Sequence, residues 1–409
     1  MSETPTSMRY LNGIPVWGEA DPDSLQQIIR CRTADAAGAA LMADHHKGYS
    51  MPIGGVVGYR NMLSPSGVGY DIGCGNKAVR TPLRVADVDI AAMMDVLWRE
   101  VAFGMGRKNP QPVDHPVLDD PTWRKPLYQM RFGKQGKTLF KLARDQLGTV
   151  GGGNHYVDLL ADEDGFLWVA VHFGSRGAGW NIAAGFMNLG RGRDFFDQPR
   201  SENMDAPPIL INAHTPLGQD YLEGMTLAGA YAYAGRDLVI EQVLRILGTR
   251  AEDSVHNHHN FAWRETHNDE QLWVVRKGAT PAWPGQRSFI GGSMGDPAYI
   301  VRGEDTPESR AGLYSTIHGA GRVMSRTQAA GRMNFRKGRR GGGLITREMM
   351  MQRIGNVVLR GGGMDEAPQA YKRIEDVIAA HAGTLTIEHV LRPVGVAMAG
   401  EDEFDPYKD

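Results

Sequence analysis

Five short blocks framed by glycine or asparagine constrain this chain more than any other feature of its sequence. Each block places a side chain that can bind a metal or attack phosphorus beside residues that let the backbone approach a ligand closely. None of the candidate ligand blocks lies near enough to another in sequence to form a zinc-finger clip. We therefore expect a fold that gathers distant loops and strand ends into one composite site. The blocks are Asp71-Ile-Gly-Cys74-Gly, Gly151-Gly-Gly-Asn154-His155, His172-Phe-Gly-Ser-Arg176-Gly, His258-His259-Asn260 and His318-Gly-Ala-Gly-Arg322.

Composition supports this expectation. Glycine makes up 52 of the 409 residues, or about 13%, whereas the average glycine content of proteins is about 7%. The glycines cluster in the blocks, which excludes a collagen repeat and a flexible linker. A net charge of −2 means that any contact with nucleic acid needs a local basic patch. Only two cysteines are present, Cys31 and Cys74, which argues against a disulfide-stapled secreted fold.

The first 18 residues are polar, with Pro and Gly, and lack the basic-then-apolar pattern of a secretory signal. No apolar run reaches the length of a membrane-spanning helix. We therefore expect a cytoplasmic protein without membrane contact. The length leaves one large domain or two domains open.

Periodicity predicts a mixed α and β chain. Apolar positions at helical spacing, with capping signals, predict helices over residues 21–40, 88–103, 134–147 and 217–247. Short β-branched runs with glycine punctuation predict strands over 166–171, 209–211 and 271–276. The strand at 166–171 leads directly into His172.

The candidate metal ligands combine one carboxylate, one thiol and three imidazoles. A carboxylate favours harder ions and a thiolate favours softer ones, so the set suits Zn, Co or Mn. Each residue taken alone is more often a buried core side chain than a ligand. Their recurrence in matching Gly- and Asn-framed blocks favours the ligand interpretation for Asp71, Cys74, His155, His172 and His259.

The candidate nucleophile is His318, which precedes Gly-Ala-Gly. The two glycines allow a phosphate to lie against the backbone, where Arg322 and Arg326 can neutralise its oxygens. A neutral imidazole can attack phosphorus and form a phosphoramidate. Spacing alone also permits a histidine that only donates a hydrogen bond.

At these residues the chain resembles the RtcB family of GTP- and manganese-dependent RNA ligases. The resemblance runs in family order from about residue 42 to residue 400. It includes the blocks above, extended to His318-Gly-Ala-Gly-Arg322-Val-Met-Ser-Arg326, and also Met42-Ala-Asp44-His45-His46-Lys-Gly48, Arg276-Lys277-Gly-Ala-Thr280, Gly292-Ser293-Met-Gly295, Asp365-Glu-Ala-Pro-Gln-Ala-Tyr371-Lys and Leu391-Arg-Pro-Val-Gly.

The resemblance implies an α/β fold specific to the family, with a sheet-rich core around a deep metal and nucleotide cleft. It also implies one catalytic domain over residues 1–409, and the acidic residues 401–409 are expected to form a flexible tail. The implied activity joins RNA ends bearing a 2′,3′-cyclic phosphate or 3′-phosphate to 5′-hydroxyl ends, in RNA repair or tRNA splicing. GTP would guanylylate His318, GMP would pass to the RNA 3′-phosphate, and the 5′-hydroxyl would expel GMP.

Roles follow from the matched motifs. The five candidate ligands would hold two Mn²⁺ ions with Cys74 as the bridge. Arg176, Lys277, Arg322 and Arg326 would bind phosphate or RNA. We hypothesise that Asp44 orients His318 through its other ring nitrogen. The nucleotide would contact Asn154, Asp158, Ser293, Gly319, Ala320, Gly321 and Tyr371.

Several positions depart from the family pattern. The nucleotide-contacting lysine of the family falls on Ala399, and a family glutamate is Asp158 here, one methylene shorter. The long helix has Ala230 and Gly235 in place of an asparagine pair. These departures put guanine selectivity over adenine in question, while the ligands and His318 are intact.

A Gly/Arg-rich stretch, residues 332–343, follows the nucleophile block and predicts an RNA contact, with a solvated loop as the alternative. Three functions remain open at this stage. They are an RNA ligase, a guanylyltransferase that caps 3′-phosphate ends without efficient sealing, and a metal-dependent RNA-binding protein with a decayed nucleotide site. We expect a monomer, with an archease-type activator as the accessory partner that the resemblance suggests.

Overall fold

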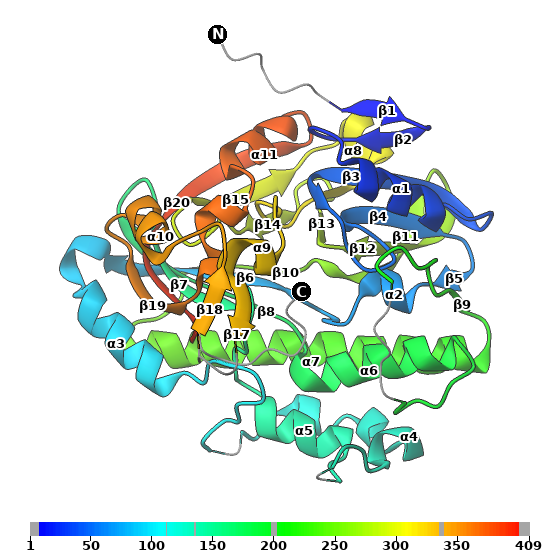
Figure 1. Cartoon of the computed structure of the whole chain (residues 1–409), viewed down its shortest axis with the longest axis horizontal. Coiled ribbons are helices and arrows are strands. Elements are labelled where there is room, and N and C mark those ends of the chain that lie inside the picture. The colour runs from blue at the N-terminus through cyan, green and yellow to red at the C-terminus, as the bar shows by residue number, and fades with distance from the viewer. Residues whose placement is uncertain (1–7, 112, 135, 198–202, 335–338, 401–409) are drawn as a thin grey trace.

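The computed structural model describes residues 8–400 except 112, 135, 198–202 and 335–338. In this part the chain forms two main β-sheets with helices around them (Figure 1). This confirms the expected mixed α/β class with a sheet-rich core. The tail expected at 401–409 lies outside the described residues. No helix of the described part is both long and apolar enough to cross a membrane.

The first sheet has the strand order β1-β2-β3-β4-β12-β11. Its neighbouring strands pair antiparallel except for β2 and β3, which are parallel. Its strands are β1 (Arg9–Leu11), β2 (Ile14–Val16), β3 (Ala36–His46), β4 (Ile53–Tyr59), β11 (Asn260–His267) and β12 (Glu270–Lys277).

The second sheet has the order β10-β6-β8-β7-β20-β15-β14, with β19 parallel to β20. Its edge strands approach each other, because the Asn257 side chain of β10 accepts a hydrogen bond from the Phe289 N–H of β14 at 3.1 Å. Its strands are β6 (Gly75–Arg84), β7 (Tyr156–Ala161), β8 (Phe166–Phe173), β10 (Asp253–His258), β14 (Arg287–Ile290), β15 (Ala298–Gly303), β19 (Val358–Gly362) and β20 (Leu385–Gly400). Smaller pairs are β5 (Met62–Leu63) with β9 (Ile211–Asn212), β13 (Ala279–Pro281) with β16 (Ser315–Ile317), and β17 (Gly331–Asn334) with β18 (Arg339–Gly342).

The longest described helix is α7 (Pro216–Ile246). Its start is fixed by Pro216 in the first turn and by the Thr215 hydroxyl, which accepts a hydrogen bond from the Gly218 N–H. The other helices are α1 (Pro22–Cys31), α2 (Pro65–Val68), α3 (Ile90–Glu100), α4 (Pro126–Gln129), α5 (Leu139–Gln146), α6 (Arg176–Leu189), α8 (Pro307–Ala311), α9 (Arg326–Ala330), α10 (Arg347–Ile354) and α11 (Ile374–Ala380). Short 3₁₀ turns cover Val85–Asp87, Pro116–Leu118, Pro121–Arg124, Met364–Glu366 and Pro368–Ala370.

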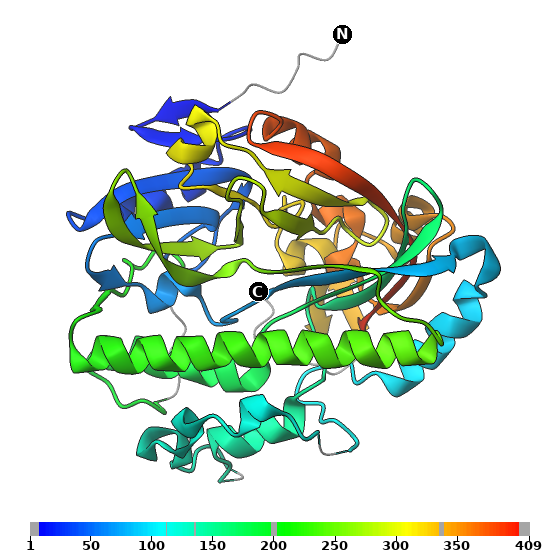
Figure 2. The ribbon, with the colours of Figure 1, turned by 180° about the vertical axis from the view of Figure 1, so that it is seen from behind.

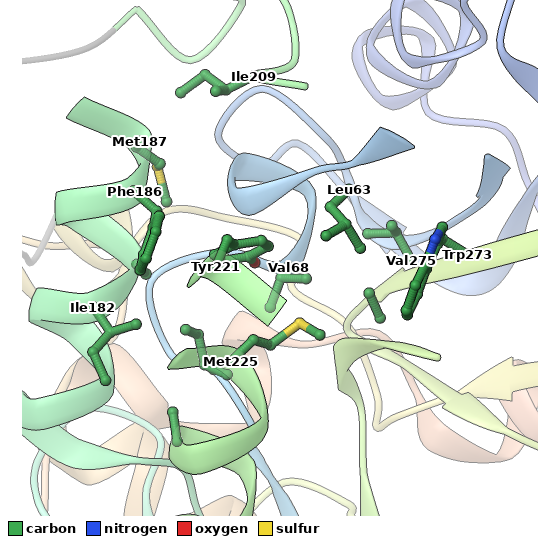
Figure 3. Close-up of a cluster of buried hydrophobic side chains, with 14 of the residues drawn as sticks. Leu63, Val68, Ile182, Phe186, Met187, Ile209, Tyr221, Met225, Trp273 and Val275 are labelled. Carbon is green, nitrogen blue, oxygen red and sulfur yellow. The ribbon is translucent and has the colours of Figure 1, made fainter. Parts of the chain in front are cut away.

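Helix α7 runs beneath both sheets and packs against each (Figure 2). Its first half contributes Tyr221 and Met225 to a cluster with α2, α6 and β12, in which Val68, Phe186 and Val275 are fully buried (Figure 3). Its second half packs Val239, Ile240 and Val243 against β8 and α3 of the second sheet. Helix α7 therefore packs against both sheets and connects their hydrophobic cores.

The predicted elements agree in part with the structure. Helices predicted over 88–103 and 217–247 are confirmed as α3 and α7, and the strands at 166–171 and 271–276 as β8 and β12. The helix predicted over 134–147 is confirmed only from residue 139, as α5. The helix predicted over 21–40 is wrong beyond residue 31, because residues 36–40 begin β3 and pair with β4. Of the strand predicted at 209–211, only Ile211 is in β9. Tertiary pairing overrides the helix propensity of the alanine-rich stretch.

Acid should destabilise the fold through two fully buried histidines, His45 and His381. Each Nε2 accepts a backbone N–H, from Asp21 at 3.0 Å and from Ala43 at 3.1 Å. Burial lowers the pKa of each to about 4 from 6.5. The folded state thus binds fewer protons than the unfolded state between these values, so stability is full above pH 6.5 and falls toward pH 4. The expected loss is up to about 3 kcal/mol per histidine.

Urea unfolding across this pH range measures the loss directly. A His381→Gln variant keeps an acceptor for the Ala43 N–H but cannot take up a proton near neutral pH. Its stability should depend less steeply on pH than that of the wild type. An equal slope in both proteins would show that His381 does not contribute to acid unfolding.

Candidate functional site

The candidate site lies where the chain crosses from one sheet to the other. His259 is the single residue between β10 of the second sheet and β11 of the first. Its N–H donates to the Cys74 carbonyl at 2.8 Å, and the Gly73 N–H donates to the Asn260 carbonyl at 2.8 Å. Gly73 has a φ of +69°, which a residue with a Cβ rarely adopts. The crossing and the glycine turn therefore hold His259 beside Cys74.

Cys74 is shared by two groups of potential ligand atoms. One group is Asp71, Cys74 and His155, and the other is Cys74, His172 and His259, each with its atoms within 4.8 Å of one another. The Cys74 Sγ lies 3.5 Å from His172 Nε2 and 3.9 Å from His155 Nε2. The structure thus brings together all five residues that the sequence analysis named as ligands.

The surrounding groups fix the orientation of these imidazoles. His155 Nδ1 donates to the Val150 carbonyl at 3.0 Å, which leaves Nε2 facing Asp71 Oδ2 at 3.1 Å. His172 Nδ1 lies 2.7 Å from Asn76 Oδ1, an acceptor, which leaves Nε2 facing Cys74. Such outer contacts set which ring nitrogen a metal can use. Sequence reasoning missed Asn76, which stands two residues after Cys74 and lies in β6.

The electrostatics of the cluster suit a bound cation. Burial lowers the pKa of His172 and His259 well below the usual value, so both rings are neutral and offer lone pairs. Burial raises the pKa of the Cys74 thiol, which a cation would offset by stabilising the thiolate. His259 Nδ1 is buried and has no hydrogen-bond partner. A thiol, a carboxylate and neutral imidazoles in one buried cluster are a donor set that fits divalent metal ions.

His318 lies against this cluster, with its ring centroid 4.9 Å from that of His259. The Asp44 carboxylate at the end of β3 holds it, because Asp44 Oδ2 accepts from His318 Nδ1 at 2.6 Å and from the His318 N–H at 2.8 Å. Burial alone would raise the pKa of Asp44, but the charge interaction and hydrogen bonds with His318 hold it below its usual value. His318 therefore carries a ring proton on Nδ1, and Nε2 is the ring nitrogen that Asp44 does not hold.

Two cavities meet at this cluster and share the lining residues His46, Ile53, Arg322 and Arg326. The smaller, of about 270 Å³, contains the site, and the larger, of about 1330 Å³, adjoins it. The smaller cavity is lined by His318 and by every residue expected to contact the nucleotide, namely Asn154, Asp158, Ser293, Gly319, Ala320, Gly321 and Tyr371.

Burial raises the pKa of the Asp158 carboxyl group well above its usual value. Its Oδ1 atom is buried and has no hydrogen-bond partner. An unpartnered buried carboxyl oxygen costs free energy unless a ligand supplies the missing group. A ligand with a donor group at this point of the cavity would relieve that cost.

The four basic side chains expected to bind phosphate or RNA do not lie together in the structure. Arg322 and Arg326 line both cavities and pair with Glu366, which also accepts from the Tyr371 hydroxyl. Sequence reasoning did not single out Glu366, although it lies in a matched block. Lys277 lines the larger cavity, where its ammonium donates to two backbone carbonyls and burial lowers its pKa to about 8.

Arg176 is placed differently from the other three. It lies buried behind His155, with Nη1 3.4 Å from His155 Nδ1, and lines neither cavity. Its guanidinium occupies the space where a Cβ on Gly151 would lie. Its expected contact with phosphate or RNA stays a prediction, and its position indicates support for the His155 loop.

Ala399, which stands where the family has a nucleotide-contacting lysine, lies in the core of the second sheet. Side chains alternate along β20, so Val396 and Met398 line the smaller cavity while Ala399 packs into the core of the second sheet. The residues of this strand that face the ligand space are Val396 and Met398.

The predicted RNA-contacting stretch at 332–343 falls partly outside the described residues. Its described ends form the antiparallel pair β17 and β18 directly after α9, which begins at Arg326. The backbone therefore places this hairpin next to the helix that carries a cavity residue.

Comparison with known proteins identifies the family of this chain. The sequence model described as tRNA-splicing ligase RtcB matches residues 27–399. An RNA-splicing ligase RtcB of Escherichia coli (strain K12) is 32% identical over 94% of this chain and 95% of its own length. A tRNA-splicing ligase RtcB of Archaeoglobus fulgidus is 31% identical over 92% and 91%, and one of Thermococcus kodakarensis is 30% identical over 87% and 86%. With a family match over nearly the whole chain, two ligand groups sharing one cysteine and an aspartate-held histidine beside them, this chain belongs to the RtcB family.

Proposed function

We propose that this protein is an RNA ligase that joins 3′-phosphate or 2′,3′-cyclic phosphate ends to 5′-hydroxyl ends, using GTP and two Mn²⁺ ions. The observation that carries the proposal is the position of His318. Asp44 holds its Nδ1 and leaves Nε2 unheld, and its ring lies against the His259 ring in a cavity lined by glycines and arginines.

The first step that these residues support is attack of His318 Nε2 on the α-phosphorus of GTP. A P–N bond forms, the bond to the β-phosphate oxygen breaks, and pyrophosphate leaves. Asp44 stabilises the positive charge that develops on the ring, as a carboxylate does for a catalytic imidazole. Arg322 and Arg326 neutralise phosphate oxygens, and the unpartnered Asp158 carboxyl meets the purine edge.

The later steps use the same atoms in turn. An oxygen of the RNA 3′-phosphate attacks the phosphoramidate and takes GMP from His318. A 2′,3′-cyclic phosphate must first be opened by water. The 5′-hydroxyl of the second strand then attacks the activated 3′-phosphorus, loses its proton, and GMP departs. Mn²⁺ held by Asp71, Cys74, His155, His172 and His259 would stabilise the charge on the phosphate oxygens.

The deciding experiment is intact-protein mass spectrometry after incubation with Mn²⁺ and GTP, followed by addition of an RNA with a 3′-phosphate and one with a 5′-hydroxyl. A GMP adduct and a joined RNA support the proposal. An adduct with capped but unjoined RNA would indicate a capping enzyme. Absence of an adduct with both GTP and ATP, in protein that binds Mn²⁺, would contradict covalent nucleotide transfer.

Replacing Asp44 by asparagine should slow formation of the GMP adduct by about 100-fold. The amide keeps the shape but loses the charge that stabilises the His318 imidazolium. Rapid quenching with mass detection gives the rate. Mn²⁺ content should not change, since Asp44 is outside both ligand groups. An unchanged adduct rate would exclude the positioning role of Asp44.

A further inference from the structure

Arg236 on α7 is a fully buried cation that the proposed chemistry does not use. Its guanidinium donates three hydrogen bonds and lies against a fourth polar atom, and none of the described carboxylates pairs with it. Nη1 donates to the carbonyls of Gly73 at 2.9 Å and Phe173 at 2.6 Å, and Nε donates to His256 Nε2 at 2.9 Å. Nη2 lies 2.9 Å from His258 Nδ1. An unpaired buried cation is costly, so its contacts must serve the surrounding structure.

The two carbonyls belong to residues bonded directly to candidate ligands. Gly73 precedes Cys74 in the turn before β6, and Phe173 follows His172 at the end of β8. These segments are neighbours in the sheet, where Gly75 pairs with Phe173. One nitrogen atom of Arg236 thus bridges the backbone on either side of the Cys74–His172 contact.

The neighbours of Arg236 fix the plane of its guanidinium. The His256 ring accepts from Nε, so its other nitrogen carries the proton and faces Asp237 at 3.5 Å. Asp237 is in turn paired with Lys77 at 2.6 Å. The Tyr233 ring centroid lies 5.1 Å from the guanidinium carbon. The Arg236 guanidinium is therefore held by residues of α7 and β10, while its Nη1 atom contacts the backbone beside Cys74 and His172.

We propose that Arg236 is a positioning residue for the proposed metal site, and that it sets the distance between the Cys74 thiolate and the His172 imidazole. The inference rests on the proposed function, since it requires that these residues bind metal. The guanidinium is planar, so one of its nitrogens can donate to both carbonyls while the other two bind different acceptors. A lysine has a single ammonium group on a flexible stem and cannot make all of these hydrogen bonds in one fixed geometry. The residue touches neither cavity, so it acts only through the ligands.

The test compares Arg236→Lys with a matched variant, Arg276→Lys. Arg276 is also fully buried, but it pairs with Glu265 on β11, away from the ligand groups. Co²⁺ serves as the probe, because a bound thiolate gives it a charge-transfer band. Affinity is measured by competition with a chelator, and thermal unfolding is measured on the metal-free proteins.

We expect Arg236→Lys to weaken Co²⁺ binding by about 10- to 100-fold and to shift or weaken the thiolate band. Arg276→Lys should lower the melting temperature without changing the affinity or the band. Wild-type affinity and band in a folded Arg236→Lys protein would overturn the inference. If Arg236→Lys does not fold, His256→Leu removes the acceptor of Arg236 Nε, together with the contact between His256 and Asp237, and should weaken binding by a smaller factor. Unchanged binding in that variant would also overturn it. A wild-type protein without a thiolate band would instead reject the metal site itself.

Discussion

His318→Ala is expected to lose the GMP adduct and to reduce joining of a 3′-phosphate end by roughly three orders of magnitude or more. The Nε2 atom is the group that would form the bond to phosphorus. Among the described histidines that line the smaller cavity, His46, His172 and His259 have no hydrogen bond to a carboxylate that could replace it. Mn²⁺ binding should persist, because both ligand groups remain intact. Mass spectrometry with GTP and a gel assay of RNA joining measure the two losses.

A bypass substrate sharpens this prediction. An RNA already carrying GMP on its 3′-phosphate needs no attack by His318, so the variant should still join it to a 5′-hydroxyl strand. Joining of this RNA together with failure on 3′-phosphate RNA and GTP would locate the histidine in nucleotide transfer alone. A GMP adduct on His318→Ala protein would contradict the assignment of the nucleophile.

The sequence predicts which side chains gather around Cys74, because each lies in a short block framed by glycine or asparagine. Helices such as α3 and α7 are also predictable, since their apolar spacing and caps are local signals. Residues 36–40 were wrongly expected to be helical because Ala-Ala-Gly-Ala-Ala has no local signal for a strand. Its pairing with β4 depends on residues some twenty positions away.

The supporting residues of the site could not be found from local patterns. Asn76, Glu366 and Arg236 act through contacts with residues far away in the chain, at separations of 96, 44 and 163 positions. Strand alternation in β20 was also needed to show that Met398, not Ala399, faces the cavity. A sequence motif identifies the atoms that react, whereas the fold identifies the atoms that hold them.

Cys74→Ala should remove more metal than loss of any other single candidate ligand. Cys74 is the residue common to both groups, whereas His155 belongs to one and His259 to the other. We expect both ions to bind at least about 100-fold more weakly, because each group loses one of three protein ligands and the anionic charge between them. His155→Ala should weaken one ion and leave the other near its wild-type affinity. Metal analysis after dialysis, together with Mn²⁺ titration, distinguishes the two patterns.

The second cysteine of the chain provides the matched control. Cys31 is fully buried at the end of α1, and burial raises its pKa to about 12, so its thiol behaves as a small apolar side chain. Cys31→Ala should cost about 1 kcal/mol of stability through the lost packing and leave Mn²⁺ binding unchanged. Equal metal loss in the two variants would point to a folding defect. Two ions retained by Cys74→Ala would refute the bridging role, since the remaining residues of each group would then suffice without the thiolate.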